Sequence, residues 1–341
     1  MNLNYIEVED IVRRALNEDI GSGDITTALT VSPASLCTAQ IISNEDGVIA
    51  GLPVASICFQ LVAESYSAGN MTVLKRVRPT NLPNVNLESR SQAGKPIRIT
   101  AKHLGKPAVQ VTGGPLPQRK PIEQDRPVIF RPEVADGSVV QPGDVVAEIT
   151  GPTAAILTAE RTALNLLQRL SGIATRTARL VSLIEGIGAT IVDTRKTTPG
   201  LRILEKYAVR MGGGQNHRFG LYDGVLIKDN HIRAAGGIKE AIQAAKAGAP
   251  HMVKIEVEAD TLAQVEQALE AGADIILLDN MSVVNMKKAV EMCKGRATTE
   301  ASGRITEDSV VKIARTGVDL ISAGALTHSV KALDLSLEIA G

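Results

Sequence analysis

The chain has 341 residues, of which 44% are hydrophobic, and 37 basic residues balance 37 acidic ones, so one large or two smaller globular domains are expected. Aromatic residues make up only 2% and there is no basic excess, which argues against nucleic-acid binding. No apolar run approaches the roughly 18 residues of a membrane span, no signal peptide is recognisable and the three cysteines are scattered, so the sequence predicts a cytoplasmic protein that does not enter a membrane.

The first predicted element is a helix over residues 7–17. The glycine-rich sequence EDIGSGDITT, at residues 18–27, predicts an exit into an extended region. Residues 134–152 alternate valines with turn residues, as a short β-rich module does. Such turns also occur in swinging-arm carrier domains, but those need an exposed lysine at a hairpin tip. This stretch contains no lysine, so that function is discarded.

The segment between these elements, residues 64–127, differs from the rest of the chain in composition. It holds 11 lysines or arginines against four acidic residues, and eight of the 15 prolines. Most of it lacks hydrophobic periodicity, which favours a solvated surface insertion. A basic arm for an anionic partner is the alternative.

The second half of the chain has a more regular pattern. A long amphipathic stretch over residues 154–185 predicts a helix. After Gly188, six short apolar runs alternate with helix-like segments, several of which end in glycine as helix C-termini often do. The runs are ATIVDT, GVLIK, VKIEVE, DIILLD, TTEAS and VDLISAG. Repeated strand and helix units predict a parallel sheet, most simply a closed or nearly closed barrel.

The residues at the ends of these six runs sort by chemical type. The first two runs end at cations, the middle two at carboxylates and the last two at small, glycine-rich turns: Arg195 with Lys196, Lys228, Glu258, Asp279, Ser302 with Gly303, and Gly324. Active sites of parallel barrels form at the carboxyl ends of the strands. We therefore expect these residues to meet in one site.

The two carboxylates indicate chemistry at a sugar phosphate. Glu256 and Glu258 share one face of their strand, and Glu258, nearer the strand end, is the functional candidate. Asp279 directly follows the apolar run IILL, where an ionised group without a function is unfavourable. Such a pair can hold a divalent cation with phosphate oxygens, or bind ribose hydroxyls and stabilise an oxocarbenium-like carbon. The turns ASGRIT and SAGALTHS fit a phosphate site.

The stretch MGGGQNHRFGLYDGVLIKDNHI, residues 211–232, combines three glycines with two histidines, an arginine and a lysine. A metal site is disfavoured because His217 and His231 lack a spacing that places two ligands on one face. Arg218 and Lys228 would also repel a cation. Together with the cations of the first strand they can instead cradle carboxylates, with the glycines allowing a tight turn. His231 is expected to be structural.

Several long motifs resemble those of one enzyme family. DTRKTTPGLRILEKYAVRMGGGQNHRFGLYDGVLIKDNHI, KIEVE, LLDNM and EASG closely match the quinolinate phosphoribosyltransferases, as do EDIGSGDITT, TAERTALNLLQRLSGIAT and SAGALTHS. The resemblance covers about residues 5–63 and 128–339. It implies an α/β fold with an N-terminal α/β sandwich domain over residues 1–153, interrupted by the insertion, and a C-terminal incomplete (open) TIM-like α/β barrel over residues 154–341. The helix over residues 154–185 would link them, and the C-terminal end would pack back on the N-terminal domain.

The resemblance implies that quinolinate and 5-phosphoribosyl-1-pyrophosphate (PRPP) react to give nicotinate mononucleotide, pyrophosphate and CO2 in NAD biosynthesis. Mg2+ would enter with PRPP near Glu258 and Asp279, with no protein ligand assigned. The active unit would be a homodimer or a higher oligomer, with Arg161 reaching into the site from the other subunit. Lys196, Glu258 and Asp279 would be catalytic. Quinolinate would be bound by Arg195, Lys196, His217, Arg218 and Lys228, and the 5-phosphate by Ser302, Gly303, Gly324 and His328.

One position departs from the family pattern. Where the family has SGGI, this chain has Ser302, Gly303, Arg304 and Ile305. A glycine at that position allows close approach to phosphate or tolerates a positive φ, so Arg304 either points outward, adds a bond to the phosphate or strains the turn. Two other functions stay open: a catalytically impaired homologue acting as a binding or regulatory protein, and another phosphosugar enzyme on the same barrel. The latter would need fewer cations than this chain offers.

Overall fold

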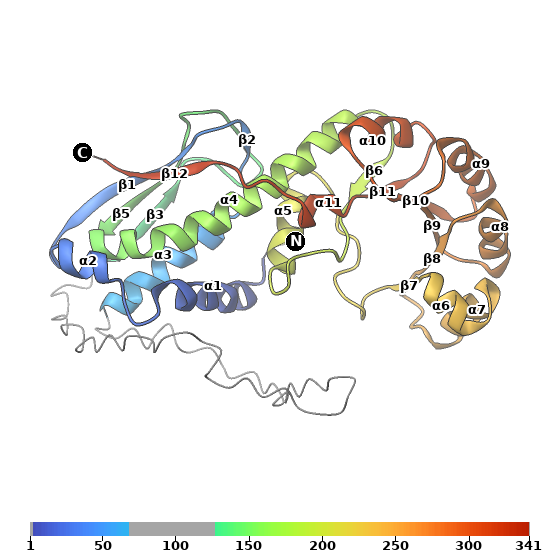
Figure 1. The fold of residues 1–341 in the computed structure, drawn as a ribbon, viewed down its shortest axis with the longest axis horizontal. Coiled ribbons are helices and arrows are strands. Elements are labelled where there is room, and N and C mark those ends of the chain that lie inside the picture. The colour runs from blue at the N-terminus through green and yellow to red at the C-terminus, as the bar shows by residue number, and fades with distance from the viewer. Residues whose placement is uncertain (1–2, 68–126, 341) are drawn as a thin grey trace, which may run out of the picture.

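One long helix bridges the two parts of the molecule (Figure 1). The computed structural model describes residues 3–67 and 127–340. The bridging helix, α4, spans Thr153–Leu183, close to the predicted bounds. It packs on helix α3 (Leu52–Ser67) in the N-terminal part and on helix α5 (Arg202–Met211) at the barrel. Of the predicted insertion, residues 64–67 belong to α3, and residues 68–126 lie outside the described chain.

The N-terminal part is built on a four-stranded antiparallel sheet against which α3 and α4 lie (Figure 1). Its last strand, β12, comes from the C-terminal end of the chain and pairs with β1 from Ala39 opposite Ile339 to Ser43 opposite Leu335. The C-terminal end is therefore a strand of the N-terminal sheet. In spatial order the strands are β12 (Leu335–Ile339), β1 (Leu36–Ser43), β5 (Val145–Pro152) and β3 (Ile129–Pro132), and a separate pair consists of β2 (Gly47–Val48) and β4 (Val139–Val140).

Two helices precede this sheet, α1 (Tyr5–Ile20) and α2 (Ile25–Thr30). Helix α1 confirms the predicted helix. The extended region expected after it is wrong, because helix α2 begins at Ile25. The cause of α2 is local: the Asp24 side chain accepts a hydrogen bond from the Thr27 backbone N–H at 2.9 Å. An aspartate cap satisfies a backbone donor that a helix start leaves free, and so favours a helix there.

The C-terminal part is a six-stranded parallel sheet that curves into an open barrel (Figure 1). The order is β6-β11-β10-β9-β8-β7, so the barrel is open between β6 and β7. All six predicted strands and the predicted open α/β barrel are confirmed. The strands are β6 (Thr190–Val192), β7 (Val225–Ile227), β8 (Ile255–Ala259), β9 (Ile275–Asp279), β10 (Thr298–Ser302) and β11 (Leu320–Ser322).

Helices alternate with these strands along the chain. The helix before β9 has the glycine that is expected at a helix C-terminus. Its C-cap is Gly272, which has the left-handed φ of 75°. None of the helices in residues 3–67 and 127–340 is long and apolar enough to cross a membrane. The barrel helices not yet named are α6 (Asp229–Ala235), α7 (Ile238–Gly248), α8 (Leu262–Ala271), α9 (Val283–Cys293), α10 (Glu307–Ala314) and α11 (Ala325–His328).

Candidate active site

The carboxyl ends of β7, β8 and β9 bring one predicted cation beside two predicted carboxylates. Lys228 Nζ lies 3.5 Å from Glu258 Oε1. Burial raises the pKa of the Glu258 carboxyl above its usual range, although the Lys228 ammonium opposes this, and the charge of Asp279 adds to the rise. The carboxylates of Glu258 and Asp279 therefore interact electrostatically, as expected for neighbours at one edge of a sheet. We call this edge, formed by the carboxyl ends of the six strands, the rim.

The turn after β10 is held tightly against the end of β9. Asn280 donates its backbone N–H to Ser302 O at 3.0 Å and its side-chain amide to Asp279 Oδ2 at 2.8 Å. A Cβ atom on Gly303, whose φ is 105°, would come within 2.2 Å of Asn280 Oδ1. Only glycine fits between the strand ends at this point. Asn280 thus orients the predicted catalytic carboxylate of Asp279. Asn280 itself has a positive φ of 51°, which few residues other than glycine adopt.

Arg304 follows Gly303 in the same turn and has a φ of 47°. This is the left-handed conformation that costs a non-glycine residue about 1–2 kcal/mol. Its side chain is exposed. The structure therefore shows why a glycine suits this position, and it places the strain in the backbone of the turn.

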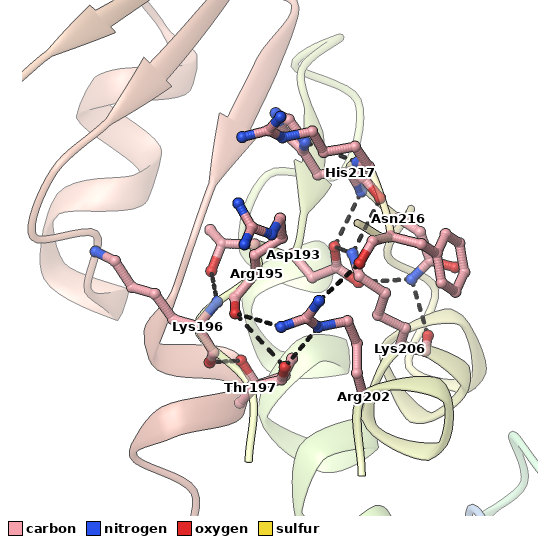
Figure 2. A network of polar contacts seen from close by, with 12 residues as sticks. Asp193, Arg195, Lys196, Thr197, Arg202, Lys206, Asn216 and His217 are labelled. Carbon is pink, nitrogen blue, oxygen red and sulfur yellow. Dashed lines mark hydrogen bonds and ion pairs between the residues drawn. The ribbon is translucent and has the colours of Figure 1, made fainter. Parts of the chain in front are cut away.

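The turn after β11 gathers three more predicted residues. A Cβ atom built on Gly324 would lie 3.0 Å from Lys196 Cδ and 3.4 Å from His328 Cδ2. Thr327 reinforces the contact by donating its hydroxyl to Lys196 O at 2.8 Å. In Figure 2 the Lys196 side chain extends away from the labelled groups around Asp193. Lys196 is thus placed beside the predicted phosphate turn.

A buried ion pair anchors the segment that carries the histidine and arginine of the predicted cradle (Figure 2). Asp193 and Lys206 are both fully buried and pair with each other. Lys206 Nζ also donates to His217 O at 3.0 Å, and the His217 backbone N–H donates to Asp193 Oδ1 at 2.9 Å. Asn216 adds a side-chain bond to Asp193 Oδ2 at 2.6 Å. The pair therefore fixes the backbone from which His217 and Arg218 project.

Arg202, one turn before Lys206 on α5, ties the first cationic loop to the same framework (Figure 2). It donates to Thr197 Oγ1 at 2.9 Å, to Arg195 O at 3.4 Å and to Phe219 O at 2.9 Å. Sequence reasoning did not single out Asp193, Arg202 or Lys206. One signal in the sequence could have identified Arg202 and Lys206. They are four residues apart, which puts both cations on one face of α5.

His217 uses both of its ring nitrogens within the chain. Its Nδ1 accepts the Arg218 backbone N–H at 2.7 Å, and its Nε2 lies 3.0 Å from Glu256 Oε2. The guanidinium of Arg218 donates to Gly224 O at 2.9 Å. Arg195 Nε is buried and has no hydrogen-bond partner among the described residues. A buried, unpaired donor in a basic loop points to an anion that the site is built to receive.

The glycines before this segment permit a close approach to α4. A Cβ atom on Gly212 would come within 2.3 Å of Ala174 O, and Gly213 has a φ of 84°. His231 has a structural contact, as expected: its Nδ1 accepts the Lys228 backbone N–H at 2.9 Å at the start of α6.

Arg161 lies on α4, in the half that faces the N-terminal helices. Its side chain is 61% exposed and its guanidinium is 3.6 Å from Glu160 Oε1. The neighbouring Thr162 hydroxyl bonds to Asp19 of α1 at 3.3 Å. Within one chain, Arg161 is therefore placed with the N-terminal part, and most of its side chain is exposed.

Comparisons with known proteins identify relatives of both parts. Residues 173–338 match the family model described as quinolinate phosphoribosyl transferase, C-terminal domain, and residues 122–171 match its N-terminal domain. The chain is 39% identical over 337 residues to a probable nicotinate-nucleotide pyrophosphorylase (carboxylating) from Bacillus subtilis, covering 99% of this chain and 95% of that protein. The carboxylating enzyme of Mycobacterium leprae is 37% identical, with 97% and 96% covered. The solved nicotinate-nucleotide pyrophosphorylase of Francisella tularensis superposes with a TM-score of 0.77 at 35% identity, covering 99% and 98% of the two chains.

Proposed function

The chain belongs to the quinolinate phosphoribosyltransferase family, and from this premise we propose how its residues carry out the family's reaction. The enzyme is a carboxylating nicotinate-nucleotide pyrophosphorylase of NAD biosynthesis: it transfers the phosphoribosyl group of PRPP to quinolinate and releases pyrophosphate and CO2. The observation that best supports a role for the rim is the meeting of Lys228, Glu258 and Asp279 at the ends of three strands.

In our proposal the cations bind the two carboxylates of quinolinate. Arg195 offers its unpaired buried Nε. Arg218 is close enough for the two guanidiniums to influence each other's charge, and Lys228 adds a cation at the end of β7. His217 contributes by holding the loop, since both of its ring nitrogens are engaged. Charge-assisted hydrogen bonds of this kind orient a planar dicarboxylate so that its ring nitrogen faces the sugar.

Glu258 and Asp279 then serve the ribose. As pyrophosphate leaves, positive charge develops at the anomeric carbon, and these carboxylates stabilise it. Their oxygens also suit Mg2+, which prefers oxygen ligands and would be held chiefly by PRPP itself; when bound, it neutralises the leaving pyrophosphate. Ser302, Gly303, Gly324 and His328 would surround the 5-phosphate, with Lys196 beside them.

Attack by the ring nitrogen forms a bond to the anomeric carbon and leaves a pyridinium. The bond from C2 to its carboxylate then breaks, CO2 departs, and the electron pair left on C2 takes up a proton. The charged ring is its own electron sink, so the protein supplies position and electrostatics.

An assay of quinolinate- and PRPP-dependent CO2 release tests this function directly. We expect release only when both substrates and Mg2+ are present. Release that is absent with both substrates, in a protein whose circular dichroism shows it folded, would favour the impaired homologue instead. Turnover of other phosphosugars without quinolinate would favour a different enzyme on the same barrel.

The loop around Arg304 carries the first mutational prediction. Arg304→Gly should raise the free energy of unfolding by about 1 kcal/mol, because glycine adopts a φ of 47° without strain. We expect activity to be retained, with KM for PRPP changed by less than about threefold, since the arginine side chain is exposed. Arg304→Ala is the matched control: it removes the guanidinium but keeps the strain. An unchanged stability in Arg304→Gly contradicts the strain, and a large drop in KM for PRPP would show that the arginine impairs the site.

We further propose that the active unit is a homodimer in the cytoplasm. The three cysteines are free thiols, which supports a reducing compartment. Arg161 is exposed on the half of α4 that faces the N-terminal helices, where a residue that completes a partner's site could lie.

Mixing two inactive variants tests the shared site. Arg161→Ala and Asp279→Ala should each be inactive alone, and their exchanged mixture should regain about a quarter of wild-type activity, because half of the dimers then contain one intact site. Sedimentation would establish the oligomer. If the mixture regains nothing although subunits exchange, Arg161 does not act across the dimer.

A further inference from the structure

Two buried carboxyl groups lie inside the barrel, beside the His217–Arg218 segment of the proposed quinolinate cradle. Glu256 on β8 is 4% exposed and Glu300 on β10 is 1% exposed. His217 Nε2 lies 3.0 Å from Glu256 Oε2 and 3.8 Å from Glu300 Oε2. Within the described residues, the second oxygen of each carboxyl, Oε1, is buried and has no hydrogen-bond partner. Together with Arg218 these groups line a cavity of about 400 Å³.

A metal ion does not fit this cluster, although its three ligand atoms lie within 4.8 Å of one another. The Nδ1 atom of His217 accepts the Arg218 backbone N–H, so its lone pair is already used. A neutral imidazole then carries its hydrogen on Nε2 and donates it to Glu256, which leaves no lone pair for a metal. The hydrogen-bond geometry instead favours a proton as the species that reduces the charge of the cluster.

Glu300 is the group that takes this proton most readily. Burial, and after it the negative charge of Glu256, raises the pKa of Glu300 to about 7. His217 and the Ser322 hydroxyl act in the opposite direction, whereas Asp193 adds to the rise. Two carboxyls this close do not both ionise easily in a buried site. Near neutral pH the cluster therefore exchanges one proton.

A dicarboxylate bound in the cradle changes this balance. Its two negative charges would lie beside His217 and Arg218, and so close to the Glu300 carboxyl. The charge of Glu256 already acts on the Arg218 guanidinium. An ionised Glu300 would add a second negative charge near it and compete with the ligand for this cation. Both effects favour the neutral form of Glu300 once the ligand is bound.

We propose that quinolinate binds together with one proton, which Glu300 takes from solvent, so that the cradle accepts a dicarboxylate only when this buried acid is neutral. No other bond forms or breaks in this step. Glu300 acts as a positioning residue, because it sets the charge of the cradle without being assigned a contact to the reacting atoms. The inference rests on the proposed function of the cradle.

The sign of the pH dependence follows from linkage. Binding raises the pKa of Glu300 above its value of about 7 in the free enzyme. Affinity for quinolinate should then be constant below that value and fall by up to about tenfold per pH unit above it, until the pKa of the complex is reached. Quinolinate itself stays a dianion over this range, so the protein is the source of the change.

Titration calorimetry with quinolinate at pH 8, in two buffers with different enthalpies of ionisation, measures the proton directly. Wild-type enzyme should take up close to one proton per quinolinate bound, because Glu300 is mostly ionised beforehand. Glu300→Gln should bind quinolinate without proton uptake and with an affinity that is nearly independent of pH between 7 and 9. Glu266→Gln, at an exposed position on α8, is the matched control and should behave as wild type.

The outcomes separate this inference from the proposed function. Wild-type binding without proton uptake overturns the role of Glu300 and leaves the function intact, as does uptake that persists in a folded Glu300→Gln variant. Absence of quinolinate binding to wild-type enzyme overturns the function of the cradle and this inference with it. The wild-type measurement decides even if Glu300→Gln fails to fold.

Discussion

Arg195→Ala should lower kcat/KM for quinolinate by about 10- to 100-fold or more. The Nε atom of Arg195 is a buried donor without a partner among the described residues, so a bound carboxylate would supply its missing hydrogen bond. A hydrogen bond to a charged group contributes roughly 1.5–3 kcal/mol, which corresponds to this loss. Steady-state kinetics with quinolinate varied at saturating PRPP gives the number. Arg218→Ala should have an effect of similar size.

Two variants show whether the effect is specific. Arg233→Ala removes an arginine whose side chain is 76% exposed on α6, and it should leave kcat/KM unchanged. Arg195→Lys keeps the charge but loses the planar fork of donors, so its activity should fall between those of wild type and Arg195→Ala. The backbone carbonyl of Arg195 is held by Thr197 N–H at 2.9 Å, which all of these variants preserve. Unchanged kinetics in both Arg195→Ala and Arg218→Ala would remove these residues from the quinolinate site.

Lys206→Met should lower the free energy of unfolding by about 3–5 kcal/mol. It leaves the fully buried Asp193 carboxylate without its cation and also removes the bond to His217 O. The cost is large because an unpaired charge in the interior loses its hydration without compensation. Urea denaturation followed by far-UV circular dichroism is the suitable measurement, because the chain contains no tryptophan.

A double variant tests the cause of that loss. Adding Asp193→Asn to Lys206→Met removes the uncompensated charge, so part of the lost stability should return. Lys239→Met, at an exposed position on α7, should change stability by no more than about 0.5 kcal/mol. If Lys206→Met is as stable as Lys239→Met, the ion pair does not anchor the segment before the cradle.

The sequence alone determined the six barrel strands and the chemical sorting of their ends. Both depend on local pattern: short apolar runs followed by polar residues identify strands, and parallel strands necessarily bring their carboxyl ends to one edge. The meeting of Lys228 with Glu258 at 3.5 Å follows from that rule and needs no knowledge of distant contacts. The departure at Arg304 was likewise visible as a residue that does not suit its turn.

Only the tertiary structure decided which charges are buried together. Asp193 and Lys206 come from a strand and the following helix, and nothing in their local patterns shows that their side chains meet in the interior. The pairing of β12 with β1 joins residues about 300 positions apart. Glu300 lies in the strand TTEAS, and the sequence of that strand does not show that its carboxyl lies close to Glu256 and His217. The charge state of a buried acid depends on neighbours a few ångströms away in space, and periodicity along the chain carries no information about them.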